Sequence, residues 1–473
     1  MVFSSVTFLF FFLPLVIAVY YAAPRRAHNA VLLAASLVFY TWGTGALVIP
    51  LVISIAANYE FGRRIEAALG RDRHRAARLT LAVAVVMNVA LLAWFKYANF
   101  AVHTFGGVLG AGSSSWRDIV LPIGISFYTF HSLSYLVDIY RRTARHLRNP
   151  IDFALYITFF PQLIAGPIVR FHEIRDQLVV RTETSGMFAA GVYRFIHGLG
   201  KKILIADSVA GVANAVFSTP TGQLNTSTAL LGVTAYTVQL YFDFSGYSDM
   251  ALGLAQMFGI RLPENFNRPY ASRSVTEFWR RWHMSLSRWF RDYLYVPLGG
   301  NRGSRLATYR NLIVVFLVTG FWHGANWTFL VWGAYHGVLL LLERIRGIGR
   351  DPRQVSTSVV AQARTVGLVM FGWILFRSPD LGYAAGFVRA LLRPGLDVPS
   401  AVRLATGPLA ILCLVIGVGS VLIPVAWVTG LRLERAPTWR VRALRATTLA
   451  IVFPVAVVFL LSGTFTPFLY FQF

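Results

Sequence analysis

The sequence has little cysteine, little lysine and little charge overall. Its one cysteine, Cys413, lies inside an apolar run, so neither a disulfide framework nor a cysteine metal site is expected. Charged residues make up 14% of the 473 residues, against roughly 25% in soluble globular domains, which argues against a soluble enzyme. With 56% hydrophobic residues, the composition also excludes an unfolded chain.

Several well-known site motifs are missing as well. The sequence has no Walker-type phosphate loop, no HExxH zinc motif and no GxSxG nucleophile elbow. We therefore predict no metal and no bound cofactor, and any chemistry must be run by histidine, hydroxyl and amide groups. Nucleic-acid-binding motifs are also absent, and the 44 basic residues, of which three are lysine, cluster between apolar runs. That arrangement predicts cytoplasmic loops beside membrane lipids, with no nucleic-acid partner.

The sequence is rich in apolar runs that are long enough to cross a hydrocarbon core of about 30 Å. The first run, 2–23, precedes Arg25 and Arg26, the reverse of a signal peptide, which predicts a retained span with the N-terminus outside. The other runs are 29–58, 79–104, 119–140, 187–217, 229–260, 311–342, 364–376, 381–392, 402–430 and 446–463. Together they predict an all-α polytopic protein of the cytoplasmic (inner) membrane with about ten to twelve crossings.

Two apolar segments are not expected to be plain helices. The run 29–58 is too long for one span and contains the turn Gly43-Thr44-Gly45, so we predict a short helical hairpin there. The segment 150–168 is interrupted by two prolines and a glycine, which favours a re-entrant element.

The longest polar section, 261–310, carries ten arginines and is predicted to be an interfacial helix region on the cytoplasmic side. Within it, seven apolar and aromatic residues recur at helical spacing from Phe278 to Tyr293. This pattern is typical of a helix that lies in the membrane plane with its tryptophans at headgroup level. His283 lies at the edge of that apolar face, where it is either part of the anchor or directed into a cavity.

Residues 311–342 form an apolar run with polar residues at its centre. We expect this run either to cross the membrane twice as two short helices or to enter the membrane and leave it on the same side. His323 lies in the string Phe321-Trp322-His323-Gly324-Ala325-Asn326-Trp327, and His336 follows thirteen residues later. Ionisable residues inside apolar segments are costly and are candidates for function. An apolar setting favours the neutral imidazole, which can accept a proton. A structural histidine bonded to a neighbouring carbonyl explains the pattern equally well.

Two carboxylates, Asp243 and Asp249, fall within the apolar run 229–260. Such groups must be paired, protonated or hydrated. Pairing with an arginine of the stretch 261–291 is the favoured explanation, and a proton relay in a transporter is the alternative. The same two explanations, a structural ion pair or a proton pathway, apply to Lys201 and Lys202.

The residues also carry a family resemblance. Glu277–Ser287, Tyr293–Arg302 and Phe321–Trp327 closely resemble the membrane-bound O-acyltransferase (MBOAT) family, and within it the bacterial alginate O-acetyltransferase branch. Tyr241–Asp249 and both ends of the chain are similar to the same branch. The resemblance therefore runs from end to end and is strongest between 241 and 337.

This resemblance implies an MBOAT fold over 1–473, a single integral-membrane domain with transmembrane, re-entrant and interfacial helices around a central funnel. It implies a catalytic histidine at His323, in the segment 311–342, and a second functional histidine at His283. The expected reaction moves an acetyl group from a cytoplasmic thioester, acetyl-CoA or an acyl-carrier protein, to an exopolysaccharide such as alginate. A separate, SGNH-like extracytoplasmic acyltransferase is the expected partner for delivery to the polymer.

The chemistry of acyl transfer assigns further roles. A neutral His323 can take the proton of an acceptor hydroxyl as that hydroxyl attacks the thioester carbonyl. Asn326, Trp322, His283 or nearby backbone N–H groups are candidates to contact the substrate or the developing oxyanion. Three alternatives remain at this stage: D-alanyl transfer, peptidoglycan O-acyl transfer, and a transporter that uses the carboxylates as its pathway.

Overall fold

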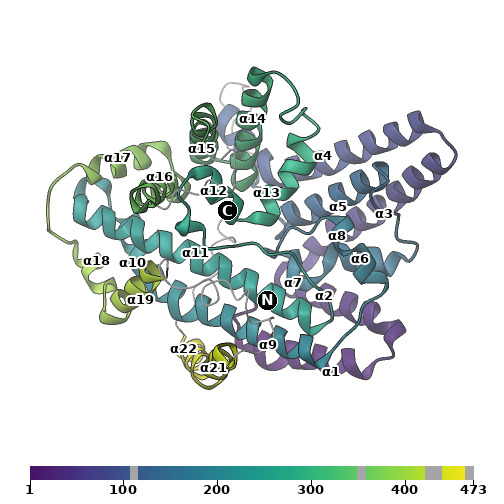
Figure 1. Cartoon of the computed structure of the whole chain (residues 1–473), viewed down its shortest axis with the longest axis horizontal. Coiled ribbons are helices and arrows are strands. Elements are labelled where there is room, and N and C mark those ends of the chain that lie inside the picture. The colour runs from purple at the N-terminus through teal and green to yellow at the C-terminus, as the bar shows by residue number, and fades with distance from the viewer. Residues whose placement is uncertain (107–115, 349–357, 421–438, 464–473) are drawn as a thin grey trace. The chain divides into compact units, whose positions relative to one another are not determined.

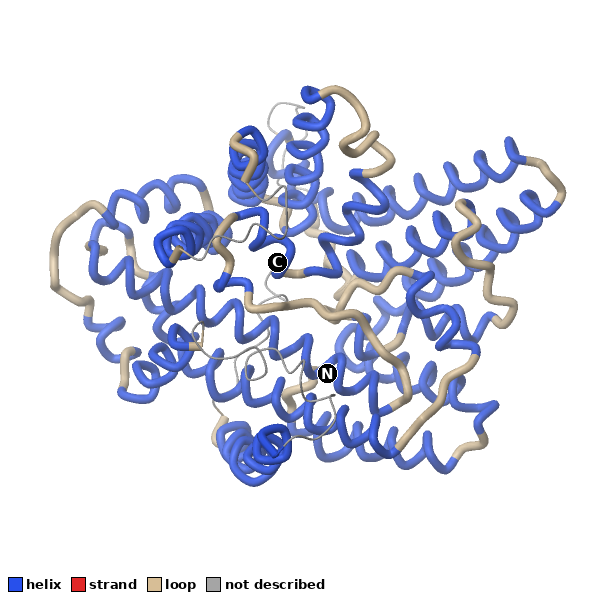
Figure 2. Tube along the Cα trace, in the orientation of Figure 1, coloured by secondary structure: helices blue, strands red, loops and turns tan. Residues whose placement is uncertain are grey.

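The computed structural model describes residues 1–106, 116–348, 358–420 and 439–463. Within these ranges every regular element is a helix and no strand occurs (Figures 1 and 2). The prediction of an all-α protein is confirmed.

The described residues divide into two compact units. Unit 1 is Met1–Phe188 together with Leu254–Pro263, and unit 2 is Ala189–Gly253 together with Glu264–Phe473. The predicted single domain over 1–473 stays a prediction.

Unit 1 is a set of packed helices. Its elements are η1 (Phe8–Phe12), α1 (Leu13–Ala22), η2 (Arg25–Ala27), α2 (His28–Thr44), η3 (Gly45–Leu47), α3 (Val48–Gly70), α4 (His74–Phe105), α5 (Ile125–Tyr140), α6 (Pro150–Thr158), α7 (Phe160–Leu163) and α8 (Phe171–Val179). The run 29–58 is broken at Gly45, which has φ +55° and ends α2. Glycine adopts this conformation at no steric cost. Since α2 and α3 make few contacts with each other, the predicted hairpin stays a prediction.

The segment 150–168 is interrupted, as predicted. It forms two short helices, α6 and α7, which meet at Phe159 and are followed by non-helical backbone up to α8. Pro161 stands in the first turn of α7, where its missing N–H has no intrahelical partner to lose. The re-entrant placement of this segment stays a prediction.

Unit 2 holds every residue singled out by the sequence for chemistry. Its elements are α9 (Ser185–Gly200), η5 (Lys201–Ala206), α10 (Asp207–Ser218), η6 (Thr221–Gln223), α11 (Thr226–Met257), η7 (Pro269–Ala271), α12 (Val275–Arg281), α13 (Met284–Phe290), η8 (Arg291–Tyr295), α14 (Arg305–His323), α15 (Trp327–Ile345), α16 (Val359–Arg377), α17 (Leu381–Leu391), α18 (Ser400–Ala405), α19 (Pro408–Gly419), α21 (Trp439–Thr447), η9 (Thr448–Val452) and α22 (Phe453–Leu461). The first residues of α9 and the last of α11 fall in unit 1.

The run 311–342 is a helical hairpin of α14 and α15, which pack closely along their length. A Cβ built on Gly320 would lie 3.1 Å from the Cα of Gly333, and one built on Gly333 would meet the carbonyl of Phe316. Since the two glycines allow this close approach, they set the distance between the two helices. The turn of the hairpin places His323 at the end of α14.

The aromatic section 275–293 departs from the single interfacial helix that was predicted. Two short helices, α12 and α13, replace it, and His283 between them adopts the left-handed conformation with φ +43°. Most of its large apolar side chains are buried within the protein: Phe278, Trp279, Trp282, Leu286, Trp289 and Phe290. The helical spacing was correct on both sides, but the first helix ends at Arg281, whose carbonyl accepts a hydrogen bond from the Asn267 N–H at 2.9 Å.

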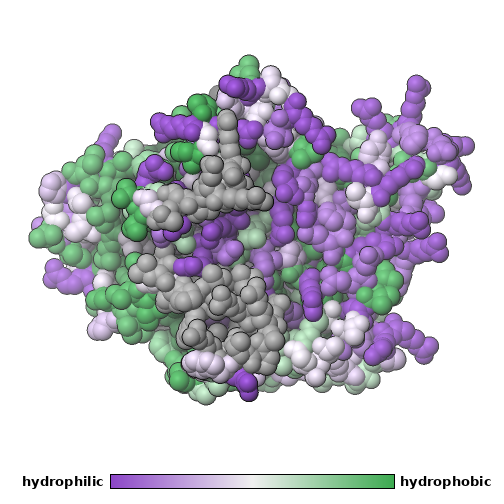
Figure 3. Space-filling model, in the orientation of Figure 1, coloured by the Kyte–Doolittle hydropathy of each residue, from purple (hydrophilic) through white to green (hydrophobic). Residues whose placement is uncertain are grey.

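Four stretches among the described residues are long and apolar enough to cross a membrane. They are Arg25–Gly70, which includes the break at Gly45, His74–Phe105, Trp327–Ile345 and Val359–Arg377. Shorter apolar helices occur at Phe8–Ala22, Leu381–Leu391, Pro408–Gly419 and Arg445–Leu461. Hydrophobic residues also gather on the surface over α17 to α19 (Figure 3). The total number of crossings stays a prediction.

Candidate active site

His323 is the last residue of α14 and is buried, with 7% of its surface exposed. Its imidazole is enclosed by aromatic rings from three helices. The ring centroids of Trp322, Trp332 and Phe376 lie 4.8, 5.2 and 5.3 Å from that of His323. The site is therefore apolar, and the imidazole is held by ring packing at a helix terminus.

His283 is completely buried between α12 and α13. Its ring lies 4.8 Å from that of Phe244, and neither of its ring nitrogens has a hydrogen-bond partner among the described residues. Burial lowers the pKa of His283 to about 3, so the imidazole is neutral at physiological pH. A neutral imidazole with both nitrogens unengaged can donate one hydrogen bond to a substrate and accept another.

The two histidines come together around one tryptophan. The Trp322 ring lies 4.8 Å from His323 and 6.4 Å from His283, measured between centroids. Trp322 is itself buried, with 3% exposed. Forty residues of sequence separate the histidines, and the fold nevertheless brings both to the same indole.

Asn326 has a structural role at the turn after His323. Its Oδ1 accepts a hydrogen bond from the Thr328 backbone N–H at 3.1 Å, which caps α15. Its Nδ2 donates to the Pro379 carbonyl at 2.9 Å. A contact of Asn326 with the oxyanion stays a prediction, and the amide would have to provide it while it caps the helix.

Asp243 and Asp249 are buried and ion-paired. Asp249 bonds Lys201 at 2.6 Å and Arg194 at 3.1 Å, and Asp243 bonds Lys202 at 2.9 Å. The cations come from α9 and η5, and not from the stretch 261–291, where an arginine partner was expected. Sequence spacing could not reveal this, because the partners of Asp249 lie about fifty residues away along the chain.

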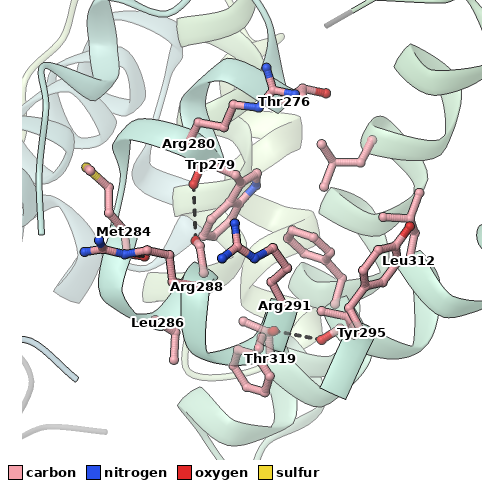
Figure 4. Close-up of a pocket in the computed structure, with 15 residues that line it drawn as sticks. Thr276, Trp279, Arg280, Met284, Leu286, Arg288, Arg291, Tyr295, Leu312 and Thr319 are labelled. Atoms are coloured by element: carbon pink, nitrogen blue, oxygen red, sulfur yellow. Dashed lines mark hydrogen bonds between the residues drawn. The ribbon is translucent and has the colours of Figure 1, made fainter. Parts of the chain in front are cut away.

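A cavity of about 560 Å³ lies beside the histidines. It is lined by Thr276, Trp279, Arg280, Met284, Leu286, Ser287, Arg288, Phe290, Arg291, Tyr295, Leu312, Val315, Phe316, Thr319 and Leu340. Figure 4 shows Trp279 at its centre, with Arg280 and Arg288 on one side and Leu312 on the other. The histidines do not line it, but Met284 follows His283 and Thr319 lies one turn before His323. The cavity is apolar inside and carries three arginines.

His336 belongs to the same cluster of rings. It is fully buried on α15, and the Trp279 indole N–H donates to its Nδ1 at 3.4 Å. Trp332 packs between His336 and His323, at 5.1 and 5.2 Å respectively. The rings thus connect His323 to Trp279 in the wall of the cavity. Among the described residues, no group of three or more His, Cys, Asp or Glu side chains could hold a metal ion.

The chain is similar in sequence to one family model and to several known proteins. The model of a family described as membrane-bound O-acyltransferases matches residues 37–352. A protein of Azotobacter vinelandii named "Probable alginate O-acetylase AlgI" is 49% identical over 389 residues, which cover 81% of this chain and 76% of the relative. A Pseudomonas aeruginosa protein of the same name is 48% identical over 400 residues, covering 84% and 75%.

A third relative acts on a different polymer, according to its name. The "Peptidoglycan O-acetyltransferase" of Helicobacter pylori is 36% identical over 425 residues, which cover 83% of this chain and 80% of the relative. All three matches span most of both chains.

Proposed function

Because the chain belongs to the membrane-bound O-acyltransferase family and is an acyltransferase and a multi-pass membrane protein, we propose that it O-acetylates an exopolysaccharide such as alginate. In this proposal the acetyl group comes from a cytoplasmic thioester and crosses the inner membrane through the protein. The identity of 48–49% to two proteins named as alginate O-acetylases favours alginate over peptidoglycan, for which the relative is 36% identical.

One observation carries the proposal: two buried histidines face one buried tryptophan. His323 acts as the general base, taking the acceptor hydroxyl proton while that oxygen attacks the thioester carbonyl. The C–O bond forms, the C–S bond breaks, and the imidazolium returns the proton to the leaving thiolate. His283, neutral and with both nitrogens unengaged, is the donor proposed for the oxyanion of the tetrahedral intermediate.

The arginine-bearing cavity supports a phosphate-bearing donor. Acetyl-CoA and an acyl-carrier thioester both present phosphate and an extended pantetheine arm. Arg280, Arg288 and Arg291 supply positive charge at the cavity, and Trp279 and Phe316 supply an apolar wall. A guanidinium binds phosphate through paired hydrogen bonds, so this mixed lining suits both parts of such a donor.

The final acceptor and partner follow from the same proposal. We assign delivery to the polymer to a separate, SGNH-like extracytoplasmic acyltransferase that receives the acetyl group on the outer side.

The test is complementation. The protein is produced in an alginate-making bacterium whose own membrane O-acetyltransferase gene is deleted, and acetyl esters on the alginate are quantified by NMR. The wild type should restore them and His323→Ala should not, at equal amounts in the membrane. Unacetylated alginate with newly acetylated peptidoglycan would move the acceptor to peptidoglycan, and D-alanyl esters would change the acyl group.

A transporter is separated from an enzyme by the fate of the thioester. Purified protein in liposomes is given labelled acetyl-CoA together with the extracytoplasmic acyltransferase and alginate oligosaccharides. An acyltransferase that uses this donor converts it to free CoA in a His323-dependent manner, whereas a transporter leaves the thioester intact. If alginate is acetylated in cells but acetyl-CoA is not consumed, a carrier-protein thioester is the donor.

A further inference from the structure

The loop that precedes α12 contains a buried asparagine whose bonds converge on the residues after His283. Asn265 has 1% of its surface exposed. Its backbone carbonyl accepts from the Met284 N–H at 2.9 Å, and its side-chain Oδ1 accepts from the Ser285 hydroxyl at 2.9 Å and the Ser285 N–H at 3.3 Å. Three hydrogen bonds thus tie the first two residues of α13 to Asn265.

The same segment is anchored on its other side. The Asn265 Nδ2 donates to the Ser248 hydroxyl of α11 at 3.1 Å. The carboxylate of Glu264 accepts from Arg194 at 2.7 Å, and its carbonyl accepts from Arg288 at 3.1 Å. We call Glu264 and Asn265 the 264–265 clasp. It connects α9 and α11 to the start of α13.

The backbone conformation of His283 requires stabilising contacts of this kind. His283 is one of four non-glycine residues with positive φ among the described residues, and a left-handed conformation is unfavourable for an L-residue because Cβ approaches the following carbonyl oxygen. In a continuous helix the Met284 N–H would bond the carbonyl of residue 280, but here it bonds Asn265. The clasp therefore replaces a helical hydrogen bond and holds the chain in the turn.

The position of the imidazole depends on that turn. Neither ring nitrogen of His283 is bonded to the described part of the protein, so no polar contact there fixes the ring. Its direction comes from the backbone conformation and from packing against Phe244 and Trp322. A backbone that relaxed toward helix would move the ring away from Trp322.

We propose that the Asn265 side chain is a positioning group for acyl transfer: through its bonds to Ser285 it holds His283 in the left-handed turn that directs the imidazole to Trp322. This inference rests on the role proposed above for His283. Asn265 acts only through that histidine, so its loss should have no effect on the reaction once the imidazole is gone.

The experiment compares Asn265→Ala with Asn225→Ala. Asn225 is also buried in unit 2 and also makes three side-chain bonds, to Ser227, Thr228 and Asp397, but it lies at the start of α11. Initial rates of label incorporation from [14C]acetate into exopolysaccharide are measured in the deletion strain and divided by the amount of each variant in the membrane. Cells supply their own donor, so the assay works with either thioester.

Asn265→Ala should lower the rate per molecule by about tenfold or more, the scale expected when a reacting group is misplaced, while Asn225→Ala should stay within about twofold of the wild type. Asn265→Asp keeps the acceptor oxygen for Ser285 and should recover more than half of the lost rate. Equal losses in the two alanine variants, or an aspartate variant as slow as Asn265→Ala, would mean a purely structural role and overturn the proposal.

A double-mutant cycle tests the route through His283. In a His283→Ala background, adding Asn265→Ala should change the residual rate by less than about twofold, because no imidazole remains to be positioned. A further tenfold fall would overturn the proposal. If His283→Ala alone is as active as the wild type, the role of His283 fails, and the positioning role fails with it. If His283→Ala is inactive and Asn265→Ala fully active, only the positioning role fails.

Discussion

The imidazole of His323 meets the indole of Trp332 edge to face, with ring centroids 5.2 Å apart and planes at 90°. Trp332 in turn packs on Trp373, with centroids 6.3 Å apart, and is 1% exposed. Trp332 is therefore enclosed by its neighbours and packs against the imidazole of His323 from a fixed position.

We predict that Trp332→Phe lowers the rate of acetylation severalfold while the protein stays in the membrane at normal levels. Phenylalanine keeps an aromatic face but leaves space beside His323, and an edge-to-face pair is worth about 0.5–1.5 kcal/mol beyond its buried area. The measurement is acetyl ester content per molecule in the complementation strain. Val331→Ala on the more exposed side of α15 serves as the control. An unchanged rate in Trp332→Phe would contradict an orienting role.

Two substitutions, His283→Ala and His283→Asn, separate the role of the backbone conformation at His283 from the role of its imidazole. Asparagine adopts the left-handed conformation more readily than alanine, so His283→Asn keeps the turn and removes the imidazole. We predict a large but partial loss of acetylation in both variants, with His283→Asn the better folded of the two. Activity at the wild-type level in both would leave His283 as a packing residue.

Much of the fold could be predicted from the sequence, because the helices of this chain follow from long apolar runs and from glycine turns such as Gly45. The left-handed turn at His283 could not. Helical spacing continues from Phe278 to Tyr293 without a proline or glycine, and the break comes from Asn265, a loop residue without any sequence signal.

The candidate site, like the fold, could be predicted from the sequence only in part. His323, Trp322 and His283 could be proposed from the sequence because polar groups in aromatic, apolar strings are unusual and because those strings resemble a family, and the fold brings their rings together. The partners of Asp249 were not found, since Arg194 and Lys201 reach it only after α9 and α11 pack. Local patterns reveal which groups are costly to bury, whereas the tertiary fold decides what compensates them.

The crossing of α14 and α15 gives a prediction about stability. Gly333→Ala should destabilise the protein by about 1–3 kcal/mol, because its new methyl would overlap the Phe316 carbonyl at a position where the backbone must move. Gly367→Ala on α16 is the matched control, since its new methyl would have no described atom within 4 Å beyond its own helix. Thermal unfolding in detergent measures both. Equal midpoints would show that α14 and α15 separate without cost.

The buried ion pairs lead to a fourth prediction. Asp249→Asn should cost about 3–5 kcal/mol, because it leaves the Lys201 ammonium, which is 4% exposed, without its carboxylate. Glu60→Gln removes two ion pairs whose arginines are 62% and 64% exposed, and it should cost about 1 kcal/mol or less. The amount of folded protein in the membrane reports the difference. Similar losses would mean that water reaches Lys201.

The last prediction concerns pH. Burial lowers the pKa of His283 to about 3, below the ordinary 6.5 that it regains in the unfolded chain. Below pH 6.5 the unfolded chain binds a proton at this position that the folded protein does not bind. The contribution of His283 to stability is therefore complete above pH 6.5 and is lost as the pH falls from 6.5 toward 3. At pH 5.5 the loss is on the order of 1 kcal/mol.

His283→Asn removes this proton uptake and leaves the other nine histidines in place. Between pH 7.5 and 5.5 the unfolding midpoint of the wild type in detergent should therefore fall further than that of His283→Asn. The comparison is made within each variant across pH, so any constant effect of the substitution on packing cancels. Parallel falls in the two proteins would show that water reaches the His283 ring in the folded protein, contrary to its complete burial.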